Sequence, residues 1–371
     1  MGASEGMMAT LCADTDAVIQ NVTSNCSVLK QNTSDDNGAI FRRTPLLQDS
    51  PTLAIIYICI AATALLLGVI GNSVIILVSL LVKSVNRVGK EFIVNLAIAD
   101  LCVSGFADPM CIVGVVKGEE WFDDKPWFCD FIATLCLTAC FCAFLSLTLV
   151  SINRYTFVCH KNIYDKIYTR TVCIIMCIIA WSAAFLLEFP NHVGWGGHVF
   201  DQKNHQCIWD RTASFSYTMV VSVGLIGSPL LLMCLCYILI FCHIYRTKAN
   251  IYRIDIDDPE RMKKAWKETL RTSRTLFVVF SVFVVCWVPY AVVIALDVKD
   301  KMPMEVHLFA TLLAHLHSSS NFLVYTICNR SFRSAVKKVI GCGEDERSSY
   351  TPDSKSTDVT KASEKDKKGR Y

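Results

Sequence analysis

Residues 143–160 read Ala143-Phe-Leu-Ser-Leu-Thr-Leu-Val-Ser-Ile-Asn-Arg-Tyr-Thr-Phe-Val-Cys-His160, an apolar segment with a charge near one end. Lipid offers no hydrogen bonds, so the ionised guanidinium of Arg154 is costly at membrane depth. Such a charge is kept where protein or water satisfies it, and it generally marks a function. We therefore interpret the segment as a membrane helix with a functional arginine near its inner end.

The composition of the chain indicates a membrane protein with several spans. Of its 371 residues, 53% are hydrophobic and only 19% are charged. A soluble domain of this length would carry more charge. The formal net charge of +3 is uninformative by itself, and we expect no nucleic-acid partner.

Seven apolar segments are each long enough to cross a hydrocarbon core of about 30 Å. They lie at Leu53–Val82, Phe92–Val116, Trp127–Cys159, Val172–Pro190, Ala213–Tyr245, Leu270–Leu296 and Met304–Cys328. Most Lys and Arg residues of the connections follow spans 1, 3, 5 and 7, which predicts that these connections are cytoplasmic. We therefore predict an all-α membrane protein, a seven-transmembrane helix bundle over residues 51–328, in the plasma membrane with its N-terminus outside and its C-terminus inside.

The N-terminal residues 1–50 are polar and lack the apolar core of a cleavable signal peptide, so the first span must act as the targeting signal. Three glycosylation sequons begin at Asn21, Asn25 and Asn32. Three sequons so close together favour an extracellular, glycosylated and disordered tail.

The C-terminal residues divide into two parts. Residues 329–342 place Phe332, Val336 and Val339 on one face and basic residues on the other, which predicts a short amphipathic helix on the inner membrane surface. Cys342 at its end could be palmitoylated. Residues 343–371 are polar and are predicted to form a disordered cytoplasmic tail, either phosphorylated or merely solvated.

Most of the 19 cysteines lie inside apolar segments, where they are typical of small buried hydrophobic residues. No CxxC…CxxC spacing accompanies them, so we expect no metal site built on cysteine. Cys129 and Cys207 differ, because each lies in a polar loop on the predicted extracellular side. A disulfide between them would tie the second extracellular loop to the top of the third span.

Each span also carries residues that are costly in an apolar helix. In chain order these are Gly71-Asn72, Asp100, Asn153-Arg154-Tyr155, Trp181, Pro229 with Tyr237, Cys286-Trp-Val-Pro289, and Asn321-Phe-Leu-Val-Tyr325. With these marks the sequence resembles the rhodopsin-like (class A) G-protein-coupled receptors over about residues 50–342. The resemblance implies a receptor, without enzyme activity, that passes an extracellular small-molecule signal to a heterotrimeric G protein.

The resemblance assigns coupling and switch roles to Asn153, Arg154, Tyr155, Tyr237, Trp287, Pro289, Asn321 and Tyr325. Proline removes an internal helix hydrogen bond, so Pro229 and Pro289 are expected to be the bends about which spans 5 and 6 move. Trp287 is either a lever at the pocket floor or core packing. Arrestin, a receptor kinase and membrane lipids could be further partners.

Two positions depart from the family pattern. The residue before Arg154 is Asn153 and not an acid, so it cannot neutralise the guanidinium. We therefore expect a loosely restrained inactive state and measurable ligand-free signalling. Phe322 stands where the family usually has Pro, and because its N–H is restored we expect a straighter turn there.

The resemblance also implies a sodium ion at Asp100, the one cofactor that we consider. Asp100, Asn72 and Asn321 can form a polar cluster in mid-bundle, with or without an ion. Two residues count against sodium, because Ala143 replaces a usual Ser and His317 a usual Asn. A structural hydrogen-bond network is therefore the alternative.

Two branches of the family look most similar. The run from Asn153 to Tyr168 and the pair Pro190-Asn191 resemble the melatonin receptors, although Leu225 stands where those receptors use a ligand-binding His. The run Cys207-Ile-Trp-Asp-Arg211 resembles the medium-chain fatty acid receptor and the insect Moody-type receptors. There the Arg binds a carboxylate. The ligand is thus left open between a lipid and a melatonin-like molecule.

We expect the ligand to contact Cys136, Asn191, Arg211, Trp287 and His315. Cys136 stands where amine receptors have an Asp, and His315 where opsins have a Lys, so amines and retinal are set aside. Arg211 is either a bidentate anion anchor or part of a loop salt bridge to Asp210 or Asp297. Glu188, near the outer end of span 4, either faces the pocket or reaches the membrane interface.

A channel or transporter is the alternative class, because intramembrane charges also mark permeation paths. The sequence shows neither an inverted repeat nor a pair of broken helices, which weighs against a transporter. An intramembrane enzyme is disfavoured, since no nucleophile with a base, and no zinc ligand set, appears at matching depth.

Overall fold

The computed structural model describes residues 44–82, 89–251 and 259–339. The predicted glycosylation sites Asn21, Asn25 and Asn32 lie outside these residues, as do Cys342 and the predicted tail at 343–371. They remain predictions from the sequence.

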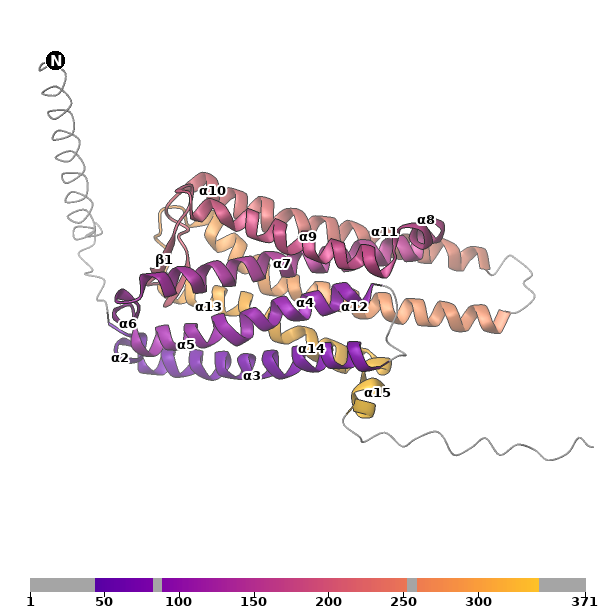
Figure 1. Cartoon of the computed structure of the whole chain (residues 1–371), viewed down its shortest axis with the longest axis horizontal. Helices are drawn as coiled ribbons and strands as arrows, with labels where there is room; N and C mark the ends of the chain where they lie inside the picture. Colours follow the sequence, from indigo (N-terminus) through magenta and orange to yellow (C-terminus); the bar gives the residue numbers. More distant parts are fainter. Residues whose placement is uncertain (1–43, 83–88, 252–258, 340–371) are drawn as a thin grey trace, which may run out of the picture. The chain divides into compact units, whose positions relative to one another are not determined.

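Six helices of the described residues are long and apolar enough to cross a membrane. They are Pro51–Leu81 (α3), Lys90–Lys117 (α4, η2, α5), Pro126–Cys159 (α7), Arg170–Asn191 (α9, η3), Phe215–Thr247 (α10, η4, most of α11) and Ser273–Leu296 (within α12). The seventh span consists of two shorter helices, Met304–His315 (α13) and His317–Cys328 (α14), which meet at Leu316. Figure 1 shows the spans side by side as a bundle. The bounds of the spans are close to the predicted ones.

The spans contain local changes of helix type, and short elements connect them. The parts of the spans are Lys90–Cys102 (α4), Val103–Ala107 (η2, a π-helix), Asp108–Lys117 (α5), Arg170–Glu188 (α9), Phe189–Asn191 (η3, a 3₁₀ turn), Phe215–Met219 (α10), Val220–Gly227 (η4, a π-helix), Ser228–Ile251 (α11) and Pro259–Leu296 (α12). The connections contain Leu46–Asp49 (α2), Glu120–Asp123 (α6), Lys161–Ile167 (α8), His198–Asp201 (β1) and Gln206–Trp209 (β2), and Arg330–Val339 (α15) follows the last span. Leu46 of α2 is buried against span 1, so this turn belongs to the folded bundle and not to the tail.

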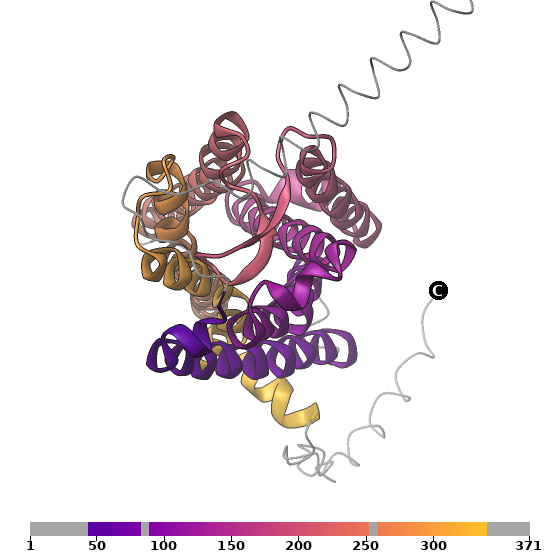
Figure 2. The same ribbon diagram turned by 90° about the vertical axis from the view of Figure 1, so that its left-hand side faces the viewer.

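The apolar segment 143–159 with Arg154 belongs to α7, the most enclosed of the six long spans. It packs against α4, α9, α11 and β2. Seen end-on in Figure 2, α7 runs through the bundle between its neighbours. Spans such as α3 and α9 instead leave large apolar residues exposed, for example Ile70 and Ile178, as expected for surfaces that face lipid.

A chain of polar side chains joins spans 2, 3 and 4. The Asn95 side-chain amide donates to Ser146 Oγ at 2.7 Å, and its oxygen accepts a hydrogen bond from Trp181 Nε1 at 3.0 Å. Both partners of Asn95 lie on other helices. Trp181 is therefore a structural residue of the bundle, which accounts for its place among the marks of the sequence.

Prolines in the spans are associated with π-helical turns as well as with simple bends. The π-helix η4 ends at Gly227, two residues before Pro229, and η2 ends at Ala107, two residues before Pro109. A wider turn is one way to accommodate a residue without an N–H. At Pro289, α12 continues through the proline.

Span 7 is interrupted at Leu316 and runs unbroken through Phe322, as expected from the missing proline. Phe322 packs directly on Gly71 of α3, where an added Cβ would lie 2.5 Å from Phe322 Cβ. The glycine therefore leaves room for the large side chain.

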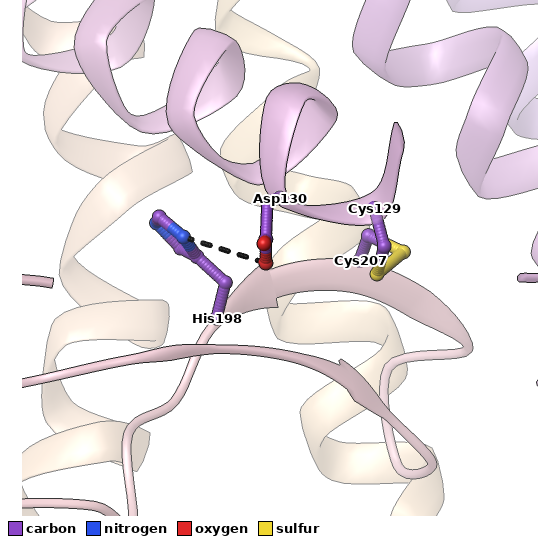
Figure 3. The surroundings of a disulfide bond; sticks show 4 residues. All are labelled: Cys129, Asp130, His198 and Cys207. Atoms are coloured by element: carbon purple, nitrogen blue, oxygen red, sulfur yellow. Dashed lines mark ion pairs between the residues drawn. A yellow bond between two sulfur atoms is a disulfide. The ribbon is translucent and has the colours of Figure 1, made fainter. Parts of the chain in front are cut away.

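The hairpin β1–β2 is an exception to the predicted all-α architecture. Its strands pair antiparallel, with His198 opposite Trp209 and Phe200 opposite Cys207. Cys207 forms a disulfide with Cys129 at the start of α7, the pair predicted from the sequence (Figure 3). We call this end of the bundle the disulfide end.

The amphipathic helix after span 7 is present as α15. Phe332 and Ala335 are buried, and Val336 and Val339 pack against the core. Basic residues such as Lys337 and Lys338 occupy its last turn. The period of the apolar residues was sufficient to predict this helix.

Candidate functional site

A small cavity of about 30 Å³ lies inside the disulfide end. Its lining consists of Cys136, Leu137, Cys140, Phe141, Ile208, Trp209, Val221, Ile226, Trp287, Tyr290, Thr311, Ala314 and His315. This apolar, aromatic lining is typical of small-molecule sites. Of the predicted ligand-binding residues, Cys136, Trp287 and His315 line the cavity.

The polar residues of the cavity wall include His315 of span 7, which pairs with Asp108 of span 2. His315 Nδ1 lies 2.7 Å from Asp108 Oδ1, and His315 Nε2 lies 3.8 Å from Cys136 Sγ. Asp108 lines, together with His315, a second, smaller cavity of about 10 Å³ that reaches Tyr57 of α3. The pair therefore separates two cavities and can orient a polar group of a ligand.

Sequence reasoning missed Asp108. An acid inside an apolar span is a signal that could have identified it, because such residues are rare and generally functional. A Pro near a helix start is commonly preceded by a capping acid, so Asp108 followed by Pro109 also resembles the start of a helix. In the structure the acid lies in mid-span, at the first residue of α5 after the π-helix η2.

Aromatic residues form the floor and the roof of the cavity. The Trp287 ring packs against Phe144 with centroids 4.7 Å apart, and against His317 at 5.4 Å. At the roof, Trp209 Nε1 donates to Tyr290 Oη at 3.0 Å. Trp209 follows Cys207 in β2, so the disulfide holds the roof onto α7.

Asn191 does not line the cavity, and its role is different from the predicted one. Its side-chain amide donates to Tyr217 Oη at 2.9 Å, and its oxygen accepts from the Gly197 N–H at 3.2 Å. These bonds fix the start of the loop that leads to β1. Asn191 therefore acts on loop geometry in this structure.

Arg211 also lies outside the cavity lining. Its Nε lies 3.2 Å from Asp201 Oδ2, and its Nη2 lies 2.5 Å from Asp300 Oδ1. The expectation of a loop salt bridge is met in kind, but the partners are not Asp210 or Asp297. The partners differ because β1 and the turn after α12 bring Asp201 and Asp300 to the guanidinium.

Further charges of both loops surround Arg211. Lys203 Nζ lies 2.7 Å from Asp300 Oδ1 and 4.0 Å from Asp297 Oδ2, and His307 Nε2 lies 2.7 Å from Asp297 Oδ2. We call Asp201, Lys203, Arg211, Asp297, Asp300 and His307 the loop latch. It joins the β hairpin to the connection between spans 6 and 7.

The loop latch shifts the pKa values of its members. Burial raises the pKa of Asp297, but hydrogen bonds with His307 and with the backbone N–H groups of Lys301 and Met302, together with the charge of Lys203, outweigh burial and leave this pKa below its ordinary value. Burial lowers the pKa of Arg211, but its two carboxylates outweigh burial and raise it. Asp297 and Arg211 are therefore both charged at neutral pH.

Asp100 lies at the centre of a polar cluster in mid-bundle. The Asn321 amide donates to Asp100 Oδ2 at 2.6 Å, and His317 Nε2 lies 3.5 Å from Asp100 Oδ1. Asn72 donates instead to the backbone oxygens of Gly68 and Ser318. Asp100 Oδ1 and Asn72 Oδ1 have no hydrogen-bond partner among the described residues.

Three of the residues assigned to coupling, Arg154, Tyr237 and Tyr325, lie together at the opposite end of the bundle. The charge of Arg154 acts on both Tyr237 and Tyr325, from spans 5 and 7. Ser151 Oγ donates to Tyr237 Oη at 3.5 Å, and the Tyr325 ring lies 5.8 Å from Phe332 of α15. The predicted set from spans 3, 5 and 7 is therefore together in space.

The neighbours of Arg154 in the sequence face different surroundings. Asn153 is buried against Gly89, where an added Cβ would lie 2.7 Å from Asn153 Oδ1. Gly89 has φ +91° at the start of α4, a conformation that favours glycine. Tyr155 Oη lies 3.0 Å from His160 Nε2, at the beginning of the connection to span 4.

Comparison with known proteins agrees with this geometry. The family model of the 7 transmembrane receptor (rhodopsin family) matches residues 71–325. The crystal structure of squid rhodopsin superposes with a TM-score of 0.70 at 18% sequence identity, and covers 85% of this chain and 93% of that chain. The chain belongs to the rhodopsin family of seven-transmembrane receptors.

Within this family the chain is similar to melatonin receptors. It is 28% identical to the human (Homo sapiens) melatonin receptor type 1B over 302 residues, which are 78% of each chain. It is 25% identical to the mouse (Mus musculus) melatonin receptor type 1A over 282 residues, which are 74% of this chain and 77% of that receptor. The protein is thus a multi-pass membrane receptor that couples to heterotrimeric G proteins, and it is neither an enzyme nor a transporter.

Proposed function

We propose that this receptor recognises a small, neutral, mostly apolar molecule in the cavity between Trp209 and Trp287. The observation that carries the proposal is the composition of the wall, in which His315, paired with Asp108 behind it, is set into a mostly apolar and aromatic lining. A few polar groups in an apolar pocket fix the orientation of a ligand.

An anionic lipid is the less favoured ligand. Its carboxylate would need a cation at the pocket, but the guanidinium of Arg211 already pairs with Asp201 and Asp300 outside the lining. The carboxylate of Asp108 would repel a second acid. A neutral molecule avoids both costs.

A melatonin-like indole fits these requirements in polarity, and it agrees with the relatives found above. Leu225 replaces the His by which the melatonin receptors are expected to hold their ligand, and it does not line this cavity. The proposal is therefore a neutral aromatic ligand held by His315 and not by span 5.

The receptor is oriented in the plasma membrane with its disulfide end outside. Disulfides persist in oxidising compartments, and the basic connections of the sequence lie at the other end. A ligand entering from outside shifts the population toward an arrangement in which span 6 opens the end near Arg154, Tyr237 and Tyr325. A G-protein helix then binds there, and arrestin and a receptor kinase use the same opening.

The basic residues of α15 lie beside its buried apolar residues, so this helix also contacts anionic membrane lipids.

The residues around Asp100 do not fit a sodium ion. The Asn321 amide donates to one oxygen of the carboxylate, and the His317 imidazole occupies the space beside the other at 3.5 Å, whereas a sodium ion requires oxygen ligands. Ala143 offers no side-chain ligand. We infer a hydrogen-bond network in which His317 takes the place of the ion.

A ligand screen on membranes from cells that express the chain tests the ligand proposal. The panel contains neutral indoles, medium-chain fatty acids and neutral lipid mediators, and the readout is nucleotide exchange on an added G protein. The potency of an active indole should fall about tenfold in His315→Ala, which removes one buried hydrogen-bonding group. It should not change in the control Ser281→Ala, whose exposed hydroxyl bonds only within its own helix.

The opposite result would be activation by fatty acids alone with loss of potency in Arg211→Ala, and it would refute a neutral ligand. Coupling is tested separately with Arg154→Ala, which should abolish exchange while the protein still reaches the cell surface.

A further inference from the structure

A cluster of side chains that could bind a metal ion lies at the disulfide end, outside the cavity lining. Glu188 ends α9, His192 follows η3, and His198 begins β1. Glu188 Oε1 lies 2.8 Å from His198 Nε2, and Glu188 Oε2 lies 3.2 Å from His192 Nε2. Glu188, expected either at the pocket or at the membrane interface, does not line the cavity.

The carboxylate of Glu188 is fully buried. Among the described residues, its neighbours of opposite charge are the two imidazoles, which are cations only when protonated. Oε2 has no hydrogen bond of good geometry among the described residues. A buried carboxylate is costly unless a cation or several hydrogen bonds compensate it. The site is therefore built to hold a positive charge.

Asp130 of α7 orients the His198 imidazole from the side of the ring away from Glu188. His198 Nδ1, on the far side of the ring from Glu188, lies 3.9 Å from Asp130 Oδ1 of α7 (Figure 3). Histidines that bind a metal commonly offer their second nitrogen to a carboxylate in this way. Thr134 Oγ1, one turn along α7, lies 3.1 Å from His192 Nε2.

Two other clusters of this kind are less suited to an ion. Asp297, Asp300 and His307 belong to the loop latch, where Lys203 already provides positive charge. Asp108, Cys111 and His315 are buried at the second, smaller cavity. The cluster at Glu188 differs because the His192 side chain is 38% exposed and gives access from solvent.

We propose that Glu188, His192 and His198 form a binding site for Zn²⁺ or a similar divalent transition metal. Two imidazole nitrogens and one carboxylate are a common zinc ligand set, with a water molecule as fourth ligand. Ligands about 2.0–2.2 Å from zinc lie about 3.3 Å from one another in a tetrahedron. The two distances above, 2.8 and 3.2 Å, are close to this spacing, and the ligand atoms of the three residues all lie within 4.8 Å of one another.

The site joins span 4 to the hairpin over the ligand cavity. His198 is opposite Trp209 in the β1–β2 register, and Trp209 lines the cavity. A metal ion bound here fixes β1 against α9 and so restrains the cavity roof. It would act as a modulator of ligand binding from a separate site.

Zinc binding to the purified full-length receptor tests the proposal without any need for the unknown ligand. We expect Zn²⁺ to raise the melting temperature by several degrees, because an ion that binds the folded state stabilises it. Mg²⁺ and Ca²⁺ should not do so, and a chelator should reverse the effect. The double variant His192→Ala, His198→Ala should bind one zinc ion fewer per chain and lose the shift.

Two further variants make the result specific. Asp130→Asn should weaken zinc binding about tenfold, as expected for loss of a carboxylate behind a ligand histidine. His205→Ala is the matched control, because His205 lies in the same loop but faces Met304 and not Glu188. Its zinc stoichiometry and its zinc-dependent shift should equal those of the unmodified receptor. Each shift is measured relative to the variant's own melting temperature.

Three results would overturn the proposal. The first is unchanged zinc stoichiometry in the double variant, which would assign binding to cysteine thiols elsewhere. The second is equal stabilisation by Mg²⁺. The third is a receptor that ignores zinc but changes its stability between pH 5 and pH 7 in a manner that the double variant abolishes, since the cluster would then bind protons alone.

Discussion

Asn153 and His317 each stand beside a charged residue, at a position where the family usually has another residue type. Asn153 precedes Arg154 and packs on Gly89, and His317 faces Asp100 at 3.5 Å. In each case the replacement changes which groups can compensate the neighbouring charge. Both departures therefore lead to predictions about switching that a single substitution can test.

Asn153→Asp should lower ligand-free signalling. A carboxylate next to Arg154 attracts the guanidinium and favours the inactive arrangement, and the two side chains have almost the same shape. We expect ligand-independent nucleotide exchange to fall roughly threefold to tenfold, as for an interaction of about 1 kcal/mol. The assay compares membranes with equal amounts of receptor. Absence of ligand-free exchange in the unmodified receptor would contradict the prediction.

His317→Asn should create sensitivity to sodium. The substitution removes the imidazole from Asp100 and supplies an amide oxygen, so the carboxylate gains space and a ligand for an ion. Ligand-independent exchange of the variant should decrease when sodium chloride replaces potassium chloride at constant ionic strength. The unmodified receptor should respond equally to both salts, and a sodium response in it would show that the ion binds despite His317.

At the scale of elements, the helices meet the sequence expectations more closely than the loops do. Span 7 breaks at Leu316, where no proline stands, and the second extracellular connection forms a hairpin. The loop latch ties this hairpin to the turn after α12 through residues 89 positions apart, Arg211 and Asp300. The latch is therefore a tertiary device that a reading of separate segments misses.

Arg211→Ala should destabilise the receptor without removing its ligand site. It leaves the carboxylates of Asp201 and Asp300 without their guanidinium, and breaking a partly buried ion pair costs on the order of 1–3 kcal/mol. Thermal unfolding in detergent should show a fall of several degrees in the melting temperature. Lys299→Ala, which removes an exposed charge of the same connection, should melt like the unmodified protein. Equal melting temperatures for both variants would refute a stabilising latch.

At the scale of the whole molecule, α7 and its disulfide connect the two functional ends. Cys129 holds the cavity roof at one end of α7, and Arg154 faces spans 5 and 7 near the other. Because the helix is enclosed along most of its length, a change of packing at the cavity can reach the coupling end through contacts with α11 and α12.

Removing the disulfide should weaken both the fold and the cavity. Cys129→Ser with Cys207→Ser opens a loop that spans 78 positions and should lower the free energy of unfolding by about 2–5 kcal/mol. The melting temperature of the purified receptor measures the effect. Cys59→Ser, at an exposed free cysteine, is the control. A double variant that melts like the control would show that packing alone holds the hairpin.

Much of the fold could be predicted from the sequence because membrane spans depend on local composition. A long apolar run must form a helix, since lipid satisfies no backbone hydrogen bond, and the amphipathic period of α15 is likewise local. The family marks were equally visible, and they led to Arg154, Tyr237 and Tyr325. The disulfide between Cys129 and Cys207 followed from the position of two cysteines outside the apolar runs.

The sequence by itself thus determined the seven spans, the receptor family and the residues at the coupling end. Only the tertiary structure decided which polar groups meet: His315 with Asp108, 207 positions apart, Arg211 with Asp300, and Glu188 with two histidines. The physical reason is that helix rotation, π-turns and loop closure set these contacts. None of these depends on the local pattern of apolar and polar residues, so the pattern does not contain the pairs.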